Sequence, residues 1–257
     1  MRILLTNDDG INAPGFFCLG KALEEFAELF VVAPDTERSG TSKSITFQHP
    51  LRVKEREVPF RCERSLMVNG TPADCSKLAL NSLLGFRPDL VISGVNSGPN
   101  LGVDIHYSGT VAGAFEGAQL GIPAMAVSLV IGRNEKPLWD ECSIILLKLF
   151  KILLQNFEKL KNTFLNINIP NREASEIGQI KFLAQGDGHY EDCYMEMTDP
   201  RGNPCYWLQG NLRLRENLEK MDQSVRGNNF ICITPLHIDH THYPQLESFS
   251  NDPAFKI

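Results

Sequence analysis

Residues 3–10 read ILLTNDDG, and this stretch decides how the rest of the chain is interpreted. An apolar run ends at Thr6, and two adjacent carboxylates, Asp8 and Asp9, follow at once. An apolar run without alternation is typical of a strand that is covered on both faces. The two carboxylates are therefore expected at the carboxyl end of a buried strand, where open α/β sheets bind their ligands.

The remaining apolar runs extend this strand into a sheet. Helical patterns lie between the early runs, and this alternation predicts a Rossmann-like, doubly wound α/β fold with a mostly parallel sheet. The predicted strands are residues 2–6, 29–34, 89–95, 124–129, 164–170 and 230–236. The predicted helices are residues 13–26, 72–85 and 109–121, followed by an amphipathic or buried helix around 144–154.

Two regions interrupt the alternation. Residues 41–69 predict antiparallel strands or a hairpin inserted before the helix at residue 72. Residues 186–229 are polar and rich in Gly, Pro and charge, which indicates a hairpin that leaves the core and a candidate oligomer contact. We expect one domain over residues 1–257, ending in a loosely held tail at 237–257 that belongs to a C-terminal oligomerisation extension.

Composition excludes several classes of protein. The formal net charge of −6 argues against a binder of nucleic acid polymers, which normally carries a basic surface. The 7 cysteines are odd in number and form no C-x-x-C motif, so neither a disulfide framework nor a thiolate zinc site is expected. The longest apolar stretch, residues 144–154, is shorter than the ~20 residues of a membrane span. We expect a cytoplasmic protein without a membrane partner.

Polar residues follow three of the predicted strands. After the first come Asp8 and Asp9, after the second comes the segment 35–44, and after the third comes the segment 96–110. These segments are dense in the oxygen ligands that suit Mg²⁺, Mn²⁺ or Ca²⁺ rather than zinc. A cation would also relieve the repulsion between the two carboxylates. The alternative is that Asp9 caps the following helix.

A shared cation places a geometric demand on the first strand. Successive strand residues point to opposite faces, so Asp8 and Asp9 reach one ion only if the strand ends at or before Asp8. Gly10 is suited to the turn that this requires.

The segment YSGTVAGA, residues 107–114, indicates a phosphate site. Ser108, Gly109 and Thr110 open a helix of small residues, and free N–H groups at a helix start bind phosphate. Ordinary capping by Ser108 or Thr110 is the alternative. A metal beside a phosphate cradle is the equipment of metal-assisted phosphoester hydrolysis.

Several long motifs, in order along the chain, together resemble the SurE family of stationary-phase survival proteins, which are metal-dependent 5′/3′-nucleotidases. The resemblance is densest in the first ~130 residues and weakest at 186–229 and after Leu236. The motifs are ILLTNDDG at the start, PDTERSGTSKSIT at 34–46, VNGTPADC at 68–75, DLVISGVNSGPNLGVDIHYSGTVAGAFEG at 89–117 and ITPL at 233–236.

The resemblance implies one divalent metal ion per subunit, Mg²⁺ or Mn²⁺, held by four residues, and hydrolysis of nucleoside 5′- and 3′-monophosphates, with short polyphosphate as a substrate of some members. It also implies homodimers or homotetramers that exchange C-terminal segments. The metal ligands fall on Asp8, Asp9, Ser39 and Asn96. Phosphate and substrate binding is assigned to Asn7, Asn100, Ser108, Gly109 and Thr110.

Asp8 and Asp9 are the expected catalytic residues. They anchor the metal, and one of them also orients or deprotonates the attacking water. A rival mechanism makes Asp8 a nucleophile that forms an aspartyl-phosphate. The alternative function is a non-catalytic, nucleotide-binding regulatory protein of Rossmann type.

Three further features have plainer alternatives. His106 precedes the phosphate turn and is either a general acid or a structural, solvent-facing residue. Thr71, with Pro72 and Asp74 after it, predicts a helix start, and the alternative is that this segment helps to shape the substrate pocket. The segment HIDHTH, residues 237–242, resembles a zinc cluster in composition, but its spacing in an extended segment does not favour convergence on one ion.

Overall fold

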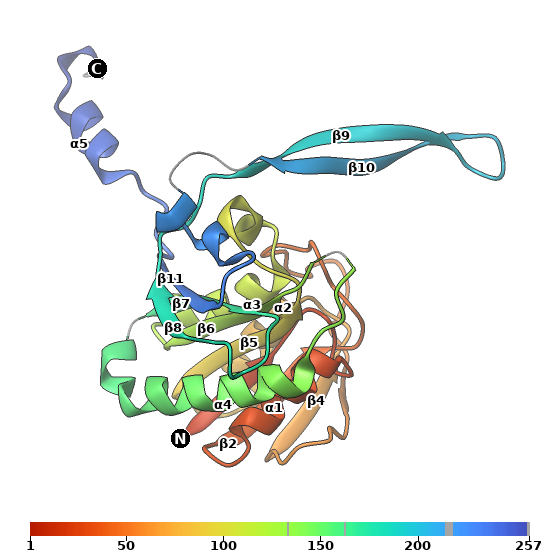
Figure 1. Cartoon of the computed structure of the whole chain (residues 1–257), viewed down its shortest axis with the longest axis vertical. Coiled ribbons are helices and arrows are strands. Elements are labelled where there is room, and N and C mark those ends of the chain that lie inside the picture. Colours follow the sequence, from red (N-terminus) through yellow and green to blue (C-terminus); the bar gives the residue numbers. More distant parts are fainter. Residues whose placement is uncertain (133, 162, 214–217, 256–257) are drawn as a thin grey trace.

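The computed structural model describes residues 1–132, 134–161, 163–213 and 218–255. A nine-stranded sheet forms the centre of this part of the chain, and a two-stranded ribbon projects from it (Figure 1). The strands of the sheet are β1 (Arg2–Thr6), β2 (Glu28–Pro34), β3 (Val53–Glu55), β4 (Arg64–Val68), β5 (Leu90–Ser97), β6 (Ala124–Val130), β7 (Phe164–Pro170), β8 (Gln179–Phe182) and β11 (Phe230–Leu236). The ribbon consists of β9 (His189–Thr198) and β10 (Pro204–Arg213).

The large sheet is mostly parallel, as predicted. Its strand order is β3-β4-β2-β1-β5-β6-β7-β11-β8. The pairs are parallel except for β3 with β4 and β11 with β7. The chain leaves β1 to form β2 on one side, and it returns to form β5 on the other side. This reversal is the topological switch point of the sheet, and it lies at the end of β1.

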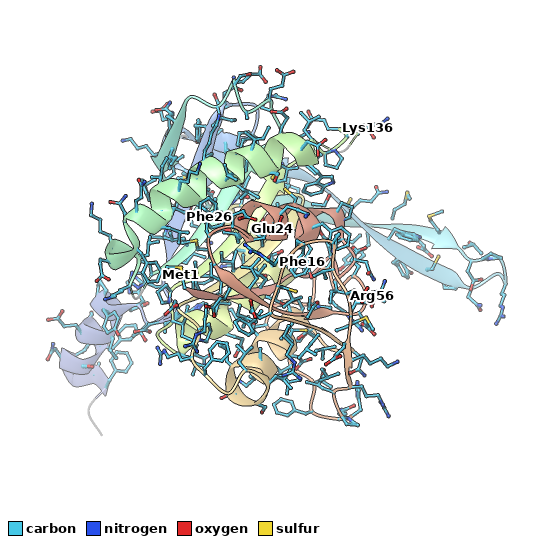
Figure 2. The ribbon with its side chains drawn as sticks, turned by 90° about the horizontal axis from the view of Figure 1, so that it is seen from below. Met1, Phe16, Glu24, Phe26, Arg56 and Lys136 are labelled. Atoms are coloured by element: carbon cyan, nitrogen blue, oxygen red, sulfur yellow. The ribbon has the colours of Figure 1, made fainter. Side chains whose placement is uncertain are left out.

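Helices cover both faces of the sheet. Alternate residues of β1 pack into different cores: Ile3 and Leu5 join one cluster, and Leu4 joins another. The first cluster includes the buried faces of α1 and α4, which lie side by side (Figure 2). The second includes residues of α2 and α3. The helices are α1 (Pro14–Leu23), α2 (Pro72–Leu78), α3 (Gly109–Gln119), α4 (Trp139–Gln155) and α5 (Tyr243–Asn251).

The inserted segment differs from the prediction. Residues 41–69 contain the antiparallel pair β3 and β4, but β4 also joins the main sheet in parallel with β2. Leu66 and Val68 are buried, so this strand extends the core instead of leaving it. The loop before β3 is fastened by the Asp74 carboxylate, which accepts hydrogen bonds from the amide and hydroxyl of Thr46 at 2.9 and 2.6 Å.

The start of α2 shows why its sequence pattern was informative. Thr71 is the N-cap. Its hydroxyl accepts a hydrogen bond from the Asp74 amide, and the Asp74 carboxylate accepts one from the Thr71 amide. This capping box confirms the predicted helix start. The predicted helix 72–85 was too long, because the α-helix ends at Leu78 and a π-helical turn, Ala79–Leu83, follows.

The C-terminal half contributes the parts that stand away from the core. Within residues 186–229, β9 and β10 pair antiparallel and form a ribbon that extends from the sheet (Figure 1). Within residues 237–257, α5 has no buried residue and points away from the rest of the chain. The sequence pattern missed the edge strand β8.

Two expectations about composition can be compared with the described residues. All seven cysteines are free. No helix among those described is both long enough and apolar enough to cross a membrane.

Candidate active site

The turn after β1 has the geometry that the two carboxylates require. The strand ends at Thr6, before Asp8, and Gly10 has a φ of +94°. The Asn7 side-chain amide donates to the Gly10 carbonyl at 2.8 Å and closes the turn. The chain therefore bends through Asp8 and Asp9, and the opposite facing of neighbouring strand residues no longer applies to them. Asn7 itself is fully buried, so in this conformation it shapes the turn from beneath.

Asp8 is a buried carboxylate held by the start of α3. Its side chain is only 4% exposed, and its Oδ1 accepts a hydrogen bond from the Thr110 hydroxyl. Burial raises the pKa of Asp8 to about 6, and the charge of Asp9 adds to the rise. Gly109 lies against the same carboxylate, because a Cβ there would stand 3.1 Å from Oδ2. A side chain at this position would push the carboxylate away.

Asp9 faces the end of β5. Its Oδ2 accepts a hydrogen bond from the Ser97 amide at 3.0 Å. Burial raises its pKa above the usual value, and the nearby charge of Glu37 raises it further. The alternative interpretation as a helix cap is wrong, because the N-cap of α1 is Ala13 and no side chain caps that helix. The Asp9 carboxylate therefore lies at the carboxyl edge of the sheet, against the end of β5.

The loop after β2 brings Ser39 and a residue that sequence reasoning missed. The Ser39 hydroxyl donates to the Glu37 carboxylate at 2.8 Å, and both side chains are exposed. The Arg38 amide donates to the Asp8 carbonyl at 2.7 Å, which ties this loop to the β1 turn. Glu37 belongs to the motif PDTERSG, so its position within that motif was the available signal.

Asn96 lies inside a strand and not beyond it. β5 runs two residues further than predicted and ends at Ser97. The amide group of Asn96 donates to the Gly98 carbonyl at 2.7 Å, so its side-chain carbonyl oxygen is the atom suited to a cation. The strand remains extended because its last residues still pair with Ser128 and Leu129 of β6.

The predicted phosphate residues occupy the start of α3 and the loop before it. Ser108 is the N-cap of α3, and its hydroxyl accepts from the Val111 amide at 3.0 Å. This is the capping alternative, and the Thr110 amide of the same turn is directed to the Asp8 carboxylate. The helix dipole still favours an anion at this end of α3. The same turn contains Gly109 and Thr110, which contact Asp8, so the cradle and the carboxylates share one site.

Asn100 is fixed by a buried polar network that the sequence did not reveal. Its side-chain amide donates to the Ser128 hydroxyl at 2.8 Å. Its backbone carbonyl accepts hydrogen bonds from the side-chain amides of Asn166 and Asn168 at 2.8 and 2.9 Å. Those partners lie on β6 and β7. Asn100 is itself only 7% exposed, and these hydrogen bonds hold its backbone in place.

The residues present fit a hard divalent cation. The candidate donors are two carboxylates, a hydroxyl and an amide carbonyl, which are all oxygen ligands. Among the described residues, no Lys, Arg or His forms an ion pair with Asp8 or Asp9. Two neighbouring carboxylates with raised pKa values and no protein cation beside them are suited to a divalent cation, whose charge would stabilise their ionised forms.

His106 and part of the HIDHTH segment line the same cavity. His106 and His240 have ring centroids 6.5 Å apart, and both line a cavity with His237 and Asp239. No group of three or more His, Cys, Asp or Glu side chains in the described ranges is arranged to hold a metal. The zinc composition of HIDHTH is therefore not matched by a zinc geometry.

The chain is similar to one protein family and to several proteins that bear its name. The family model "Survival protein SurE" matches residues 3–192. The 5′-nucleotidase SurE of Alkaliphilus metalliredigens is 42% identical over 253 residues, which cover 98% of both chains. The 5′/3′-nucleotidase SurE of Klebsiella pneumoniae is 42% identical over 98% of this chain and 96% of its own. The crystal structure of the Aquifex aeolicus SurE protein aligns with a TM-score of 0.81 and 38% identity, covering 96% of this chain and 98% of that one.

Proposed function

The chain belongs to the SurE family of survival proteins and is a nucleotidase, and on this premise we propose that it hydrolyses nucleoside 5′- and 3′-monophosphates to nucleoside and phosphate with the help of one divalent metal ion. One observation carries the proposal for the site. The buried Asp8 carboxylate at the switch point of the sheet contacts Thr110 of the phosphate turn, and its backbone is tied to the loop that contains Ser39.

Asp8, Asp9, Ser39 and Asn96 would hold the metal, which is Mg²⁺ or Mn²⁺. When bound, such a cation withdraws charge from phosphate oxygens and lowers the pKa of a water molecule. Two carboxylates balance the charge of a divalent ion, and the two neutral donors add no further negative charge, so the site would not repel an anionic substrate as the bare carboxylates do. The oxygen-only donor set and the lack of a protein ion pair at Asp8 and Asp9 in the described residues support this assignment.

The phosphate would lie over the start of α3. The positive end of the helix dipole favours the charge of an anion there. Gly109 keeps the approach open, since a side chain there would meet Asp8. Asn100 would contribute from the neighbouring loop, where the Ser128 and Asn168 contacts hold it in place. Asn7 would support the turn that presents the carboxylates.

Either Asp8 or Asp9 would orient the attacking water and accept its proton. Thr110 fixes the Asp8 carboxylate and the Ser97 amide fixes that of Asp9, so each retains an oxygen whose direction is set. A rival role makes Asp8 the nucleophile. Isolation of a phosphorylated Asp8 after acid quenching would overturn the water mechanism, whereas release of phosphate labelled from H₂¹⁸O without such an adduct supports it.

One assay tests the activity. The protein is incubated with AMP and with 3′-AMP in the presence of Mg²⁺ or Mn²⁺, and phosphate release is measured before and after addition of EDTA. We expect release from both nucleotides and its loss on chelation. Release that survives chelation contradicts the metal assignment. If no nucleotide is hydrolysed with either metal, a non-catalytic nucleotide-binding protein becomes the better description.

The remaining parts of the proposal concern substrate range, assembly and location. Short polyphosphate is a further substrate, because the turn at α3 recognises phosphate rather than a base. The protein forms homodimers or homotetramers through the β9–β10 ribbon and the C-terminal helix, whose exposed apolar side chains support this. A cytoplasmic location agrees with seven free cysteines.

A further inference from the structure

The segment between β5 and α3, residues 98–108, is held in place by side chains from the C-terminal half of the chain. It contains Asn100 and is called the Asn100 loop below. The Asp222 carboxylate accepts a hydrogen bond from the Gly102 amide at 2.9 Å through Oδ2. The Gly102 carbonyl accepts one from the Gln185 side chain at 3.0 Å. Both backbone polar groups of Gly102 therefore have side-chain partners, which lie 120 and 83 residues further along the chain.

An apolar contact holds the same loop from the same side. Leu101 is 1% exposed and belongs to a small buried cluster that includes Val225 and Phe230. Asp222 and Val225 are the first and last residues of a single turn of 3₁₀ helix. This turn therefore supplies both a hydrogen bond and an apolar contact that place the Asn100 loop.

The second oxygen of Asp222 bonds to the root of the β9–β10 ribbon. Its Oδ1 accepts a hydrogen bond from the Gly186 amide at 2.9 Å, three residues before β9 begins. The neighbouring Gln223 side chain exchanges two hydrogen bonds of 3.3 Å with the backbone of Gly188. One carboxylate thus joins the Asn100 loop to the ribbon root.

A carboxylate suits this position better than an amide. Asp222 is 0% exposed, so its charge is buried at a cost in desolvation. Its two oxygens provide one acceptor for each backbone N–H, whereas an asparagine would offer one acceptor oxygen and one donor group. A donor placed against a buried N–H leaves that N–H unpaired. The residue type therefore fits a joint that holds two backbone segments at once.

We propose that Asp222 is a positioning residue for phosphate hydrolysis. Through the Gly102 amide it holds the Asn100 loop in the conformation that presents Asn100 to the phosphate, and it ties that conformation to the ribbon root. Asp222 acts through the backbone of the loop and not by contact with the substrate. The proposal rests on the proposed nucleotidase function and on the assignment of Asn100 to phosphate binding.

The test compares Asp222→Asn with the wild type in the whole protein with Mn²⁺. kcat for AMP should fall about 10-fold, because a small displacement of a positioning group is costly. The Kd of inorganic phosphate, measured by calorimetry, should rise at least about fivefold, the size of one weakened hydrogen bond to a charged group. The Kd of Mn²⁺ should stay unchanged, because pairing of β5 with β6 still holds Asn96. Partial unfolding would lower the number of binding sites and leave the phosphate Kd as it is.

Asp199→Asn is the matched control. The Asp199 carboxylate also accepts hydrogen bonds from two backbone amides, those of Arg201 and Asn203, each at 2.8 Å. It lies in the turn between β9 and β10, at the far end of the ribbon (Figure 1). This variant should match the wild type in kcat and in both dissociation constants.

Two outcomes would overturn the proposal. One is an unchanged kcat and phosphate Kd in a folded Asp222→Asn protein, and the other is a loss of Mn²⁺ affinity as large as the loss of phosphate affinity. If Asp222→Asn does not fold, Gln185→Ala decides, because it removes the bond to the Gly102 carbonyl from a partly exposed side chain. A raised phosphate Kd in that variant supports the proposal, and an unchanged one overturns it. Failure of the nucleotidase function shows differently, as no hydrolysis of AMP by the wild type.

Discussion

The carboxyl edge of the sheet and the C-terminal extension depart from the usual distribution of side chains in opposite directions. At the edge, the polar residues Asp8, Asn100 and Thr110 are buried. In the extension, the apolar residues Trp207 and Leu246 are 64% and 53% exposed. Buried charge needs a compensating partner, and clustered exposed apolar surface indicates a contact.

The two regions call for partners of different kinds. The edge has excess negative charge that a cation would neutralise. The unfolding free energy that these carboxylates cost should therefore depend on pH and on the metal concentration. The extension has apolar surface that another copy of the chain would cover. The free-energy cost of exposing this surface should therefore depend on protein concentration. Substitutions that act on one region should leave the other unaffected.

The largest effect is expected at Asp8. Asp8→Asn keeps an acceptor for the Thr110 hydroxyl but removes the charge that would hold the metal. Hydrolysis of AMP should fall by at least about 10²-fold, because the charge stabilisation of the transition state depends on this residue. Steady-state kinetics with Mn²⁺ measures the loss. Residual activity within a few-fold of wild type would separate Asp8 from the chemistry.

The same substitution should stabilise the protein when metal is chelated. The folded-state pKa of Asp8 is about 6 and its ordinary value is 3.8, so the folded state binds this proton more tightly. The wild type therefore loses unfolding free energy as pH rises from about 4 to 6, and by pH 7 the loss is about 3 kcal/mol.

Chemical denaturation in EDTA at several pH values measures this difference. Asp8→Asn should exceed the wild type in unfolding free energy at pH 7 and approach it near pH 4, since Asn does not titrate. A gap that stays constant with pH would show that desolvation of the carboxylate is not its cause. Saturating Mn²⁺ should raise the stability of the wild type and have little effect on the variant.

An intermediate effect is expected at Glu37. Its carboxylate accepts a hydrogen bond from the Ser39 hydroxyl, which leaves the lone pairs of that hydroxyl oxygen facing a cation. Glu37→Ala should weaken Mn²⁺ binding about 10- to 100-fold in calorimetry, as is usual when a partner of a metal ligand is removed. Glu37→Gln retains an acceptor and should lose less. Glu57→Ala, an exposed glutamate on another loop, serves as the control, and equal affinities in all four proteins would refute the role.

The smallest effect on stability is expected in the ribbon. Trp207 faces Met195 across the β9–β10 pair and is largely exposed, so Trp207→Ser removes little core. The unfolding free energy at a fixed low concentration should change by no more than about 0.5 kcal/mol. Light scattering should nevertheless show a shift to smaller species. An unchanged mass would exclude this ribbon as the oligomer contact.

Sequence reasoning succeeded where the signal was local. The bounds of β1, β7 and β11 were predicted to the residue because each is a largely apolar stretch that is followed at once by a polar residue. The capping box at Thr71 was predicted because its four residues are adjacent in the chain. Sequence reasoning failed at β8, a four-residue edge strand with no fully buried residue. Its hydrophobic pattern does not differ from that of a loop.

The site shows the same division. The sequence alone determined that oxygen-rich segments follow β1 and β2 and that the chain turns at Gly10, because strand length and glycine placement are short-range properties. Only the tertiary structure decided that Thr110 donates a hydrogen bond to Asp8, 102 residues away in the chain, and that Asn96 stays in its strand. It also decided that the His106 and His240 rings lie 6.5 Å apart. Those contacts depend on the order of strands in the sheet, which no local pattern encodes.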